Sequence, residues 1–285
     1  MTDETENEPK GAPTPVAERA LWLQARRQGI GASDSPAILG LDKYRTALEV
    51  WAEKRGLIEP TDLADNEAVE WGTRLQRVIG EALAERTGWK VRHSGPYRIR
   101  KAKTAPFVTA TLDATVSTTA HEAIAGKGGP GVDSWPLLGL GALEIKTAGH
   151  FLADEWGEEP PLRHQVQLQH QLLVTGYTWG VLAALLGGQR LVWHVLARNP
   201  AFIDALLNRL AAFWGQVQSG ERPPIDGSKA CATVLAKLHP LDTGETIALP
   251  AEAADWNFRR KVAAAQVRDW EESQRAADNW LKAAI

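Results

Sequence analysis

Apolar and polar residues alternate at residues 143–147, Leu-Glu-Ile-Lys-Thr, and this pattern predicts a β-strand. Successive side chains of a strand point to opposite faces, so Glu144 and Lys146 share one face and Leu143 and Ile145 the other. Residues 107–113 also predict a strand. Between the two, a Gly/Pro-rich interval around residues 126–131 is typical of a long hairpin loop, so we expect the two strands to be neighbours.

Helical signals precede and separate these strands. Thr46 and Glu49 form a capping-box pattern that opens a short helix ended by Gly56. A longer helix is predicted over residues 67–87, with Gly88 as its stop. We expect its apolar stripe to lie in the core; the stripe consists of Trp71, Leu75, Val78, Ile79 and Leu83.

A third helix is predicted over residues 164–176. One of its faces mixes glutamine and leucine, which suits a helix with one end in a polar channel; a polar helix surface is the alternative. The residues on this face, at helical spacing, are Gln165, Leu168, Gln169 and Leu172. We assign neither His164 nor His170 to a metal, because such histidines are more often surface or hydrogen-bonded core residues.

The C-terminal part of the chain predicts a hairpin followed by helices. Residues 181–186 and 190–196 read as two strands about Gly187-Gly188. Asn199 and Pro200 then open an amphipathic helix that ends at Gly220. Residues 250–285 are helical by propensity. We expect them to pack on the preceding domain, with joining of neighbouring subunits as the alternative.

These elements predict three regions. Residues 1–14 are acidic and Pro-containing, and we expect them to be disordered. Residues 15–225 form the main domain, and residues 226–285, beyond Pro223-Pro224, form a helical C-terminal extension.

Composition narrows the class of protein. A chain of 285 residues with 44% hydrophobic content can bury a large core. Its single cysteine, Cys231, excludes a disulfide framework, a Cys₄ zinc site and an iron–sulfur cluster, and it fits a reducing cytoplasm. The apolar runs are too short to span a bilayer, so we expect a soluble protein without membrane contact.

The net charge of −3 argues mildly against general affinity for nucleic acid, but charge is unevenly distributed. Residues 86–103 contain seven Lys and Arg and no acidic residue. This stretch could follow a phosphate backbone, with Trp89, His93 and Tyr97 interleaved. Equally, it could be a solvated basic edge strand that resists pairing with other chains.

The candidate chemistry centres on two carboxylates. If Asp113 and Glu144 converge, their oxygens form a hard-ligand site suited to Mg²⁺ or Mn²⁺. Lys146, on the same strand face as Glu144, could orient an attacking water or neutralise a transition state. The alternative is a solvent-facing strand with an ordinary charged pair.

A second candidate site lies in the N-terminal part of the chain, before the helix predicted from Thr46. Residues 26–36 read as a glycine-containing turn that runs into a helix, with Ser35 as N-cap and Pro36 in the first turn. Free backbone amides beside Arg27 would favour an anion. The Gly-Lys-Ser/Thr of a P-loop is absent, so a nucleoside triphosphate is not indicated. A capped structural turn is the alternative.

Several short motifs together resemble the YqaJ-type viral recombinase family, relatives of phage lambda exonuclease. They are GIGASD at 29–34, AILG at 37–40, KYRT at 43–46, WGT at 71–73, TLD at 111–113, LEIKT at 143–147 and QLQHQLLVTG at 167–176. Each is weak alone, but their order and spacing over residues 20–225 are specific.

The resemblance implies a restriction-endonuclease-like PD-(D/E)XK core, a mixed central sheet flanked by helices. It also implies a Mg²⁺-dependent exonuclease that digests one strand of duplex DNA from the 5′ end and leaves 3′ tails for an annealing protein. Such an enzyme would act in the cytoplasm of a phage-infected or prophage-carrying bacterium. A homo-oligomeric ring follows by analogy with the lambda relative only.

Carried over by motif, Asp113 and Glu144 match the metal-binding carboxylates, the Ile145 carbonyl a further ligand and Lys146 the catalytic lysine. The family's contacts to the 5′ phosphate and the scissile region fall on Arg27, Ser33, Thr111 and Gln169. Gln165 shares the helix face of Gln169.

One position departs from the family pattern. The glutamate that normally follows Trp-Gly-x-x-x is replaced by Gln76, and Glu81 would point about 140° away on the same helix. A neutral amide supplies no charge to a second metal. The alternatives to an exonuclease are therefore a DNA-end-binding protein with weak or lost catalysis, or a structure-specific endonuclease.

Overall fold

The computed structural model describes residues 15–61, 66–95, 97–118, 139–241, 244 and 246–285. The predicted tail at 1–14 and the Gly/Pro-rich loop around 126–131 lie outside these residues. The chain divides into two compact units, Met1–Leu238 and His239–Ile285, and each is described by itself. The first unit extends beyond Pro223-Pro224, because the helix α7 (Lys229–Leu238) belongs to it.

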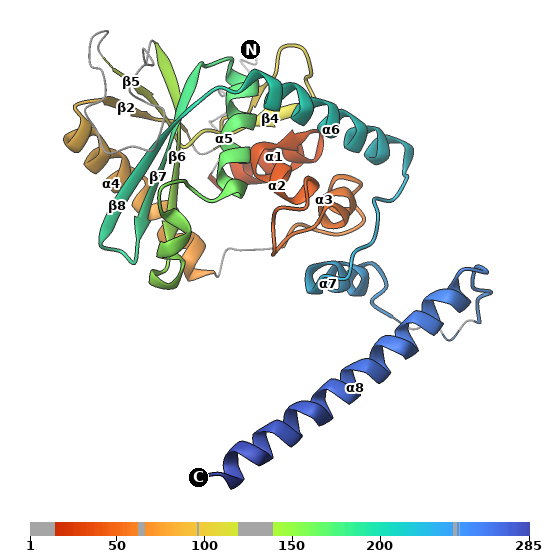
Figure 1. Ribbon diagram of the computed structural model, residues 1–285. Helices are drawn as coiled ribbons and strands as arrows, with labels where there is room; N and C mark the ends of the chain where they lie inside the picture. The colour runs from red at the N-terminus through yellow and green to blue at the C-terminus, as the bar shows by residue number, and fades with distance from the viewer. Residues whose placement is uncertain (1–14, 62–65, 96, 119–138, 242–243, 245) are drawn as a thin grey trace, which may run out of the picture. The chain divides into compact units, whose positions relative to one another are not determined.

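A five-stranded mixed sheet forms the framework of the first unit (Figure 1). Its strands, in spatial order, are β2 (Lys90–His93), β5 (Ala114–Ser117), β6 (Leu140–Ala148), β7 (Trp179–Leu186) and β8 (Arg190–Ala197). Only β6 and β7 run parallel. The tight turn between β7 and β8 uses Gly187 and Gly188 with φ of +59° and +72°, values that favour glycine. The predicted hairpin is confirmed.

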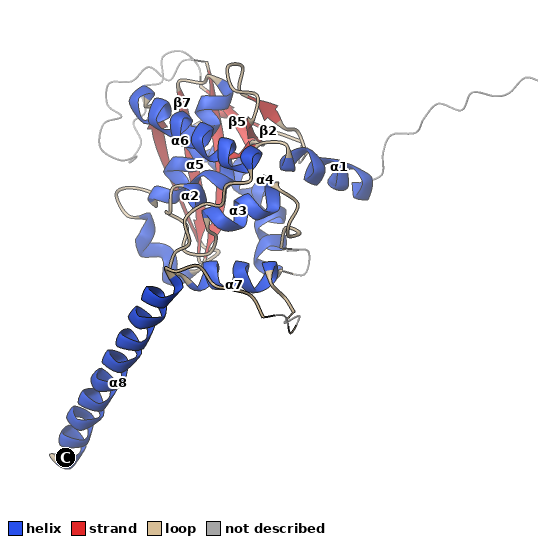
Figure 2. Cartoon of the chain, turned by 90° about the vertical axis from the view of Figure 1, so that its right-hand side faces the viewer, coloured by secondary structure: helices blue, strands red, loops and turns tan. Residues whose placement is uncertain are grey.

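Helices cover both faces of this sheet, as Figure 2 shows from the side. Alternate residues of β6 and β7 point to opposite faces. Leu143 and Ile145 pack with Ile79 and Leu83 of the helix α4 (Glu67–Thr87). On the other face, Leu182 packs with the helices α5 (Leu162–Thr175) and α6 (Pro200–Ser219). The predicted mixed sheet flanked by helices is therefore confirmed.

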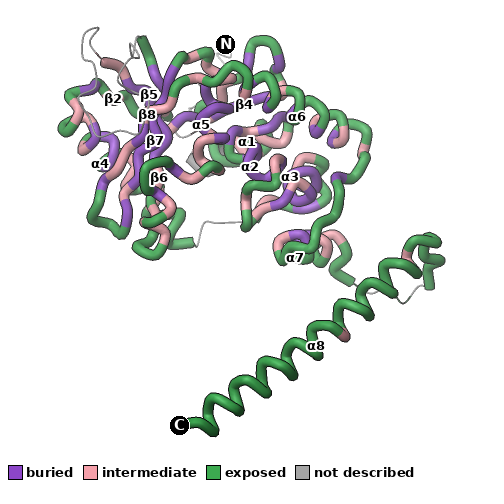
Figure 3. Tube along the Cα trace, in the orientation of Figure 1, coloured by how far each residue is buried: buried purple, intermediate pink, exposed green. Residues whose placement is uncertain are grey.

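A second, smaller sheet lies at the N-terminal side of the first unit. Its strands are β1 (Ile30–Gly31), β4 (Val108–Ala110) and β3 (Arg100–Lys101), in that order. It shares a buried cluster with several helices, and Figure 3 shows this second core. The helical segments in this cluster are the 3₁₀ turn η1 (Ala32–Asp34), α2 (Ser35–Ile38), α3 (Ala47–Lys54), α6 and α7. The helix α1 (Pro15–Arg27) lies against β1 and α3. A further 3₁₀ segment, η2 (His150–Trp156), follows β6.

Three local predictions need correction. The strand expected at 107–113 is divided: β4 belongs to the small sheet, and Asp113 comes directly before β5 of the large one. Trp71 and Val78 are exposed, because α4 turns Gly72, Leu75, Ile79 and Leu83 inward. The cap of α2 is Asp34, and Ser35 is the first helical residue.

Other helix ends follow the predicted caps. The Thr46 hydroxyl accepts from the backbone N–H of Glu49 at 3.2 Å, and the Asn199 side chain accepts from that of Phe202 at 3.0 Å. The strand β2 lies at the edge of its sheet, so residues 90–93 form the predicted basic edge strand.

The second unit consists mainly of one helix, α8 (Ala253–Ala283), which has no buried residue. Among the described residues, no helix is long and apolar enough to cross a membrane.

Candidate active site

The pairing of β5 with β6 brings the two candidate carboxylates together. Ala114 pairs with Leu143, so Asp113, one residue earlier, lies beside Glu144 and Ile145. One carboxylate oxygen of Asp113 accepts from the backbone N–H of Ile145 at 2.8 Å. The other accepts from the side-chain amide of Gln76 on α4 at 3.0 Å. Asp113 is thereby fixed from both the sheet and the helix.

Glu144 is held by three side-chain donors. It is only 4% exposed, so the alternative of a solvent-facing charged pair is excluded for this residue. Its Oε1 accepts from Lys146 Nζ and from Gln167 Nε2, each at 2.6 Å. Its Oε2 accepts from Gln171 Nε2 at 2.5 Å. Gln167 and Gln171 are four residues apart on α5, so they occupy the same helix face.

The electrostatics of this site are those of two acids close together. Burial and the negative charge of Glu144 raise the pKa of Asp113 to about 7. Burial alone would lower the pKa of Lys146, but the Glu144 and Asp113 carboxylates outweigh it and raise that pKa. At neutral pH the lysine is a cation that compensates one of the two carboxylates. The second carboxyl, Asp113, is about half ionised at pH 7, and a bound cation would stabilise its charged form.

This donor set fits a small divalent cation. Two carboxylates and a backbone carbonyl at Ile145 are hard oxygen ligands, the type that Mg²⁺ and Mn²⁺ prefer. Within the described ranges, no group of three or more His, Cys, Asp and Glu could hold a metal. At this site the Gln76 amide donates a hydrogen bond to Asp113, at a position where a glutamate would add a third carboxylate. Glu81 is exposed and pairs with Arg77.

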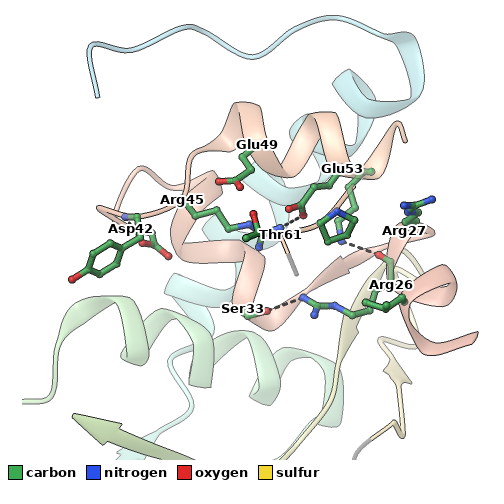
Figure 4. Close-up of a pocket in the computed structure, with 12 residues that line it drawn as sticks. Arg26, Arg27, Ser33, Asp42, Arg45, Glu49, Glu53 and Thr61 are labelled. Atoms are coloured by element: carbon green, nitrogen blue, oxygen red, sulfur yellow. Dashed lines mark hydrogen bonds and ion pairs between the residues drawn. The ribbon is translucent and has the colours of Figure 1, made fainter. Parts of the chain in front are cut away.

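A hollow lies among α1, η1, α3 and the segments directly before and after α3 (Figure 4). Its volume is about 450 Å³. Both predicted phosphate-binding residues, Arg27 and Ser33, line it. These two residues, both described by the structure, do not contact each other in a hydrogen bond: the Ser33 hydroxyl accepts from Arg26 at 3.1 Å, and Arg27 pairs with Glu59. Four cations and three acids line the hollow, so their charges largely balance: Arg26, Arg27, Arg45, Lys54, Asp42, Glu49 and Glu53.

Beneath this hollow, Asp34 is fully buried and surrounded by cations. It forms ion pairs with Arg45 at 2.6 Å and Lys54 at 2.7 Å, and Arg26 lies 3.6 Å away. Its carboxylate also accepts from the backbone N–H of Gly31 at 2.9 Å. Burial would raise the pKa of Asp34, but Lys54, Arg45 and Arg26 hold it well below its usual value.

His170 joins the two regions. Its Nε2 lies 2.9 Å from the carbonyl oxygen of Thr109, and its Nδ1 lies 2.6 Å from the Ser35 hydroxyl. A carbonyl oxygen only accepts, so the neutral ring carries its proton on Nε2, and Ser35 donates to Nδ1. Burial lowers the pKa of His170 to about 4, which keeps the ring neutral at pH 7. Because Gln167 and Gln171 lie on the same helix, α5 contacts both regions at once.

The remaining predicted site residues are dispersed. Thr111 lies between β4 and β5, two residues from Asp113. The Gln169 side chain bonds to the backbone of Ala197 at 2.6 Å and of Asn199 at 2.9 Å, at the start of α6. Gln165 donates to the Pro160 carbonyl at 2.7 Å. Thus neither predicted glutamine of α5 is bonded to Glu144.

Sequence reasoning missed Gln167, Gln171 and Asp34. The first two were recognisable from their spacing of four residues, but the run of alternate glutamines at 165, 167, 169 and 171 offers two different helix faces. Asp34 gives no such signal, because its partners come from residues 26, 45 and 54.

Known proteins resemble this chain in sequence and in fold. The sequence model of the YqaJ-like viral recombinase domain matches residues 21–178. Uncharacterized protein YqaJ of Bacillus subtilis (strain 168) is 32% identical over 225 residues, which are 78% of this chain and 63% of that protein. The chain therefore spans less than two thirds of that relative's length.

Among solved structures, an alkaline exonuclease (LHK-Exo) from Laribacter hongkongensis matches with a TM-score of 0.52 at 19% identity, over 70% of this chain and 93% of that one. The complex of LHK-Exo with dAMP matches with a TM-score of 0.51 at 18% identity, over the same shares. This likeness shows the fold and confirms the predicted fold class, a mixed sheet flanked by helices. With more than half of its residues matched by the family model, the chain belongs to the YqaJ-like viral recombinase family.

Proposed function

We propose that this protein is a divalent-metal-dependent exonuclease that degrades one strand of linear duplex DNA from its 5′ end. The observation that carries the proposal is the convergence of Asp113, Glu144 and Lys146 between β5 and β6. Membership of a viral recombinase family and a fold shared with an alkaline exonuclease support it. The products would be 3′ single-stranded tails, the substrate of an annealing protein.

In this proposal Asp113, Glu144 and the Ile145 carbonyl hold Mg²⁺ or Mn²⁺. The ion would supply Lewis-acid activation of water and stabilisation of charge on the phosphate. Gln167 and Gln171 fix the orientation of Glu144, and Gln76 fixes that of Asp113. Lys146, kept protonated by the two carboxylates, would stabilise the negative charge that develops on the phosphate.

The hollow beside Ser33 is our candidate for the terminal phosphate of the degraded strand. Its best phosphate donors are Arg27, whose partner Glu59 is exposed, and Arg26, which already reaches Ser33. Thr111 extends from the loop that carries Asp113 and would meet the scissile region. Gln165 and Gln169 would act through the position of α5, because their amides are engaged with backbone carbonyls.

A second candidate function is binding of DNA ends with little or no catalysis. The Gln76 amide favours it, because this position donates a hydrogen bond to Asp113 and adds no charge for a second ion. Both candidates place DNA at the same site, and they differ in whether the phosphodiester bond is cleaved.

Release of nucleotides from linear duplex DNA tests the proposal. We expect release that requires Mg²⁺ or Mn²⁺, is faster on 5′-phosphorylated than on 5′-hydroxyl ends, and is abolished in Lys146→Ala with DNA binding retained. Binding of ends without release would favour the second candidate. Cleavage of closed circles would point to an endonuclease. Molar mass in solution tests the ring arrangement.

A further inference from the structure

The helix α8 has apolar side chains that nothing in its own unit covers. It is the only helix or strand among the described residues from 239 to 285, and it spans 31 residues, about 46 Å. Several large side chains are more than half exposed: Trp256, Phe258, Val267, Trp270, Trp280 and Leu281. Long helices in water are usually stabilised by packing of an apolar face. The pattern of these side chains therefore indicates what packs against α8.

One stripe of α8 repeats with spacings of four and three residues. We call it the seam, and its members are Trp256, Arg260, Ala263, Val267, Trp270, Gln274, Ala277 and Leu281. An average spacing of 3.5 residues is the repeat of a two-stranded coiled coil, and α8 is long enough for about four such heptads. Phe258 lies on the opposite side of the helix, so it is not part of the seam.

Charge divides α8 into two halves. Residues 253–268 contain four basic residues and one acidic residue, whereas residues 269–283 contain four acidic and two basic residues. A second α8 in the antiparallel orientation would place each basic half beside an acidic half. In the parallel orientation, like charges would face each other along the whole helix.

Side-chain size in the seam selects the same orientation. An antiparallel pair centred between Arg268 and Asp269 matches Trp256 with Leu281 and Val267 with Trp270. The two long polar residues then meet alanines: Arg260 faces Ala277, and Gln274 faces Ala263. A parallel pair in register would instead place Arg260 against Arg260 and each tryptophan against its own copy.

We propose that α8 is a homotypic interaction surface, which pairs in antiparallel orientation with α8 of a second copy of this chain. The proposal is independent of the nuclease assignment, because none of the seam residues belongs to the candidate active site. Polar residues at seam positions specify the register and oligomer state of coiled coils at some cost in stability. Arg260 and Gln274 fit that role.

Molar mass of the full chain, measured by light scattering or sedimentation over a range of concentrations, gives the first test. Trp270→Lys places two charges at the centre of the seam and should halve the molar mass. Phe258→Lys is the matched control, since it replaces another exposed aromatic residue of α8 outside the seam. It should leave the mass unchanged. A mass that Trp270→Lys does not alter overturns the proposal.

Disulfide trapping gives the orientation. Ala263→Cys and Gln274→Cys proteins are mixed under mild oxidation, with the natural chain, whose Cys231 is buried, as the control. We expect a covalent dimer in the mixture and none from either variant alone, because each position lies about 16 Å from its own copy in an antiparallel pair. Covalent dimers from each single variant would mean a parallel pair and would overturn the assignment.

The remaining outcomes also decide the matter. If α8 packs back on its own chain or binds a different protein, Trp270→Lys has the same molar mass as the natural chain. The mixture of the Ala263→Cys and Gln274→Cys variants then forms no disulfide-linked dimer. Circular dichroism of Trp270→Lys excludes simple loss of the helix as the cause of a reduced mass.

Discussion

Two aspartates, Asp34 fully buried and Asp113 partly buried, have opposite electrostatic environments in this protein. Asp34 lies within reach of Arg26, Arg45 and Lys54, and these cations hold its pKa well below the usual value. Asp113 lies beside Glu144, and burial together with that second acid raises its pKa to about 7. The protein supplies every counter-charge that Asp34 needs, whereas the Asp113 region shares one lysine between two carboxylates.

This difference distinguishes a charge that stabilises the fold from one that is suited to a ligand. A buried ion that is fully paired contributes to structure, and its removal leaves uncompensated partners. An under-compensated acidic pair costs stability in the free protein and gains it back when a cation binds. The two regions should therefore respond in opposite ways to mutation, pH and metal.

The largest effect is expected on activity at the carboxylate pair. Glu144→Gln removes the charge of one proposed metal ligand, and nucleotide release should fall on the order of a thousandfold, which corresponds to about 4 kcal/mol. The fold should persist, because the change also removes repulsion with Asp113. Nucleotide release and thermal unfolding are the measurements. Glu81→Gln, an exposed glutamate of α4, is the control and should retain full activity.

The next effect is on stability at the paired aspartate. Asp34→Asn leaves Lys54, whose side chain is 4% exposed, without its carboxylate, and it removes one of the two carboxylates that pair with Arg45. We expect a loss of about 3–5 kcal/mol in the free energy of unfolding, measured in urea. Glu59→Gln, which removes the charge of an exposed partner of Arg27, should cost less than about 1 kcal/mol. Equal losses in the two variants would contradict the distinction.

The third effect is a pH dependence of stability in the metal-free protein. The pKa of Asp113 is about 7, above its ordinary value of 3.8, so the folded state holds this proton more tightly than the unfolded chain. The resulting stability is fully present below about pH 4 and is lost as pH rises through about 7. Asp34 acts in the opposite sense: its stability is present above its ordinary pKa and is lost as pH falls further.

Urea unfolding in EDTA at pH 5 and pH 8 measures this contribution. The free energy of unfolding of the natural chain should fall by about 2 kcal/mol more than that of Asp113→Asn between these pH values. Added Mg²⁺ should reduce the difference at pH 8, because the cation replaces the proton. A natural chain and variant with parallel pH profiles would refute the raised pKa.

The smallest effect is expected at Gln76. A third carboxylate there would increase the excess of negative charge around Asp113, whereas Asp34 is surrounded by cations. Gln76→Glu replaces a hydrogen-bond donor to Asp113 by a carboxylate, and it should lower the Mg²⁺ concentration for half-maximal digestion by about threefold to tenfold. If the natural chain is inactive, the same change should create activity. A titration of rate against Mg²⁺ decides it: an unchanged or weaker metal dependence means that Gln76 only positions Asp113.

The sequence was sufficient for features that depend on neighbours in the chain. Alternation at 143–147 placed Glu144 and Lys146 on one face of a strand, and the caps at Thr46 and Asn199 opened helices where predicted. Each of these signals is local, because strand faces and helix caps are decided within a few residues.

Features that depend on contacts between residues far apart in the chain could not be predicted from the sequence. The phase of α5 relative to the sheet decides that Gln167 and Gln171 contact Glu144 while Gln169 bonds to the backbone at the start of α6. The division of residues 107–113 between two sheets likewise depends on the partners of β4 and β5, which lie far away in the chain. The order of the family motifs led to the site but did not reveal these contacts.

The contacts of α5 also constrain how the length of this protein can change during evolution. A residue inserted between Gln167 and Gln171 would rotate one relative to the other by about 100° and leave Glu144 with a single glutamine. An insertion between Gln167 and His170 would also rotate these two residues relative to each other. The contacts of His170 with Ser35 and of Gln167 with Glu144 could then not both be kept. The turn at Gly187-Gly188 carries none of these contacts and can accept added residues. Insertions and deletions in natural relatives should therefore accumulate at that turn and be absent from the middle of α5.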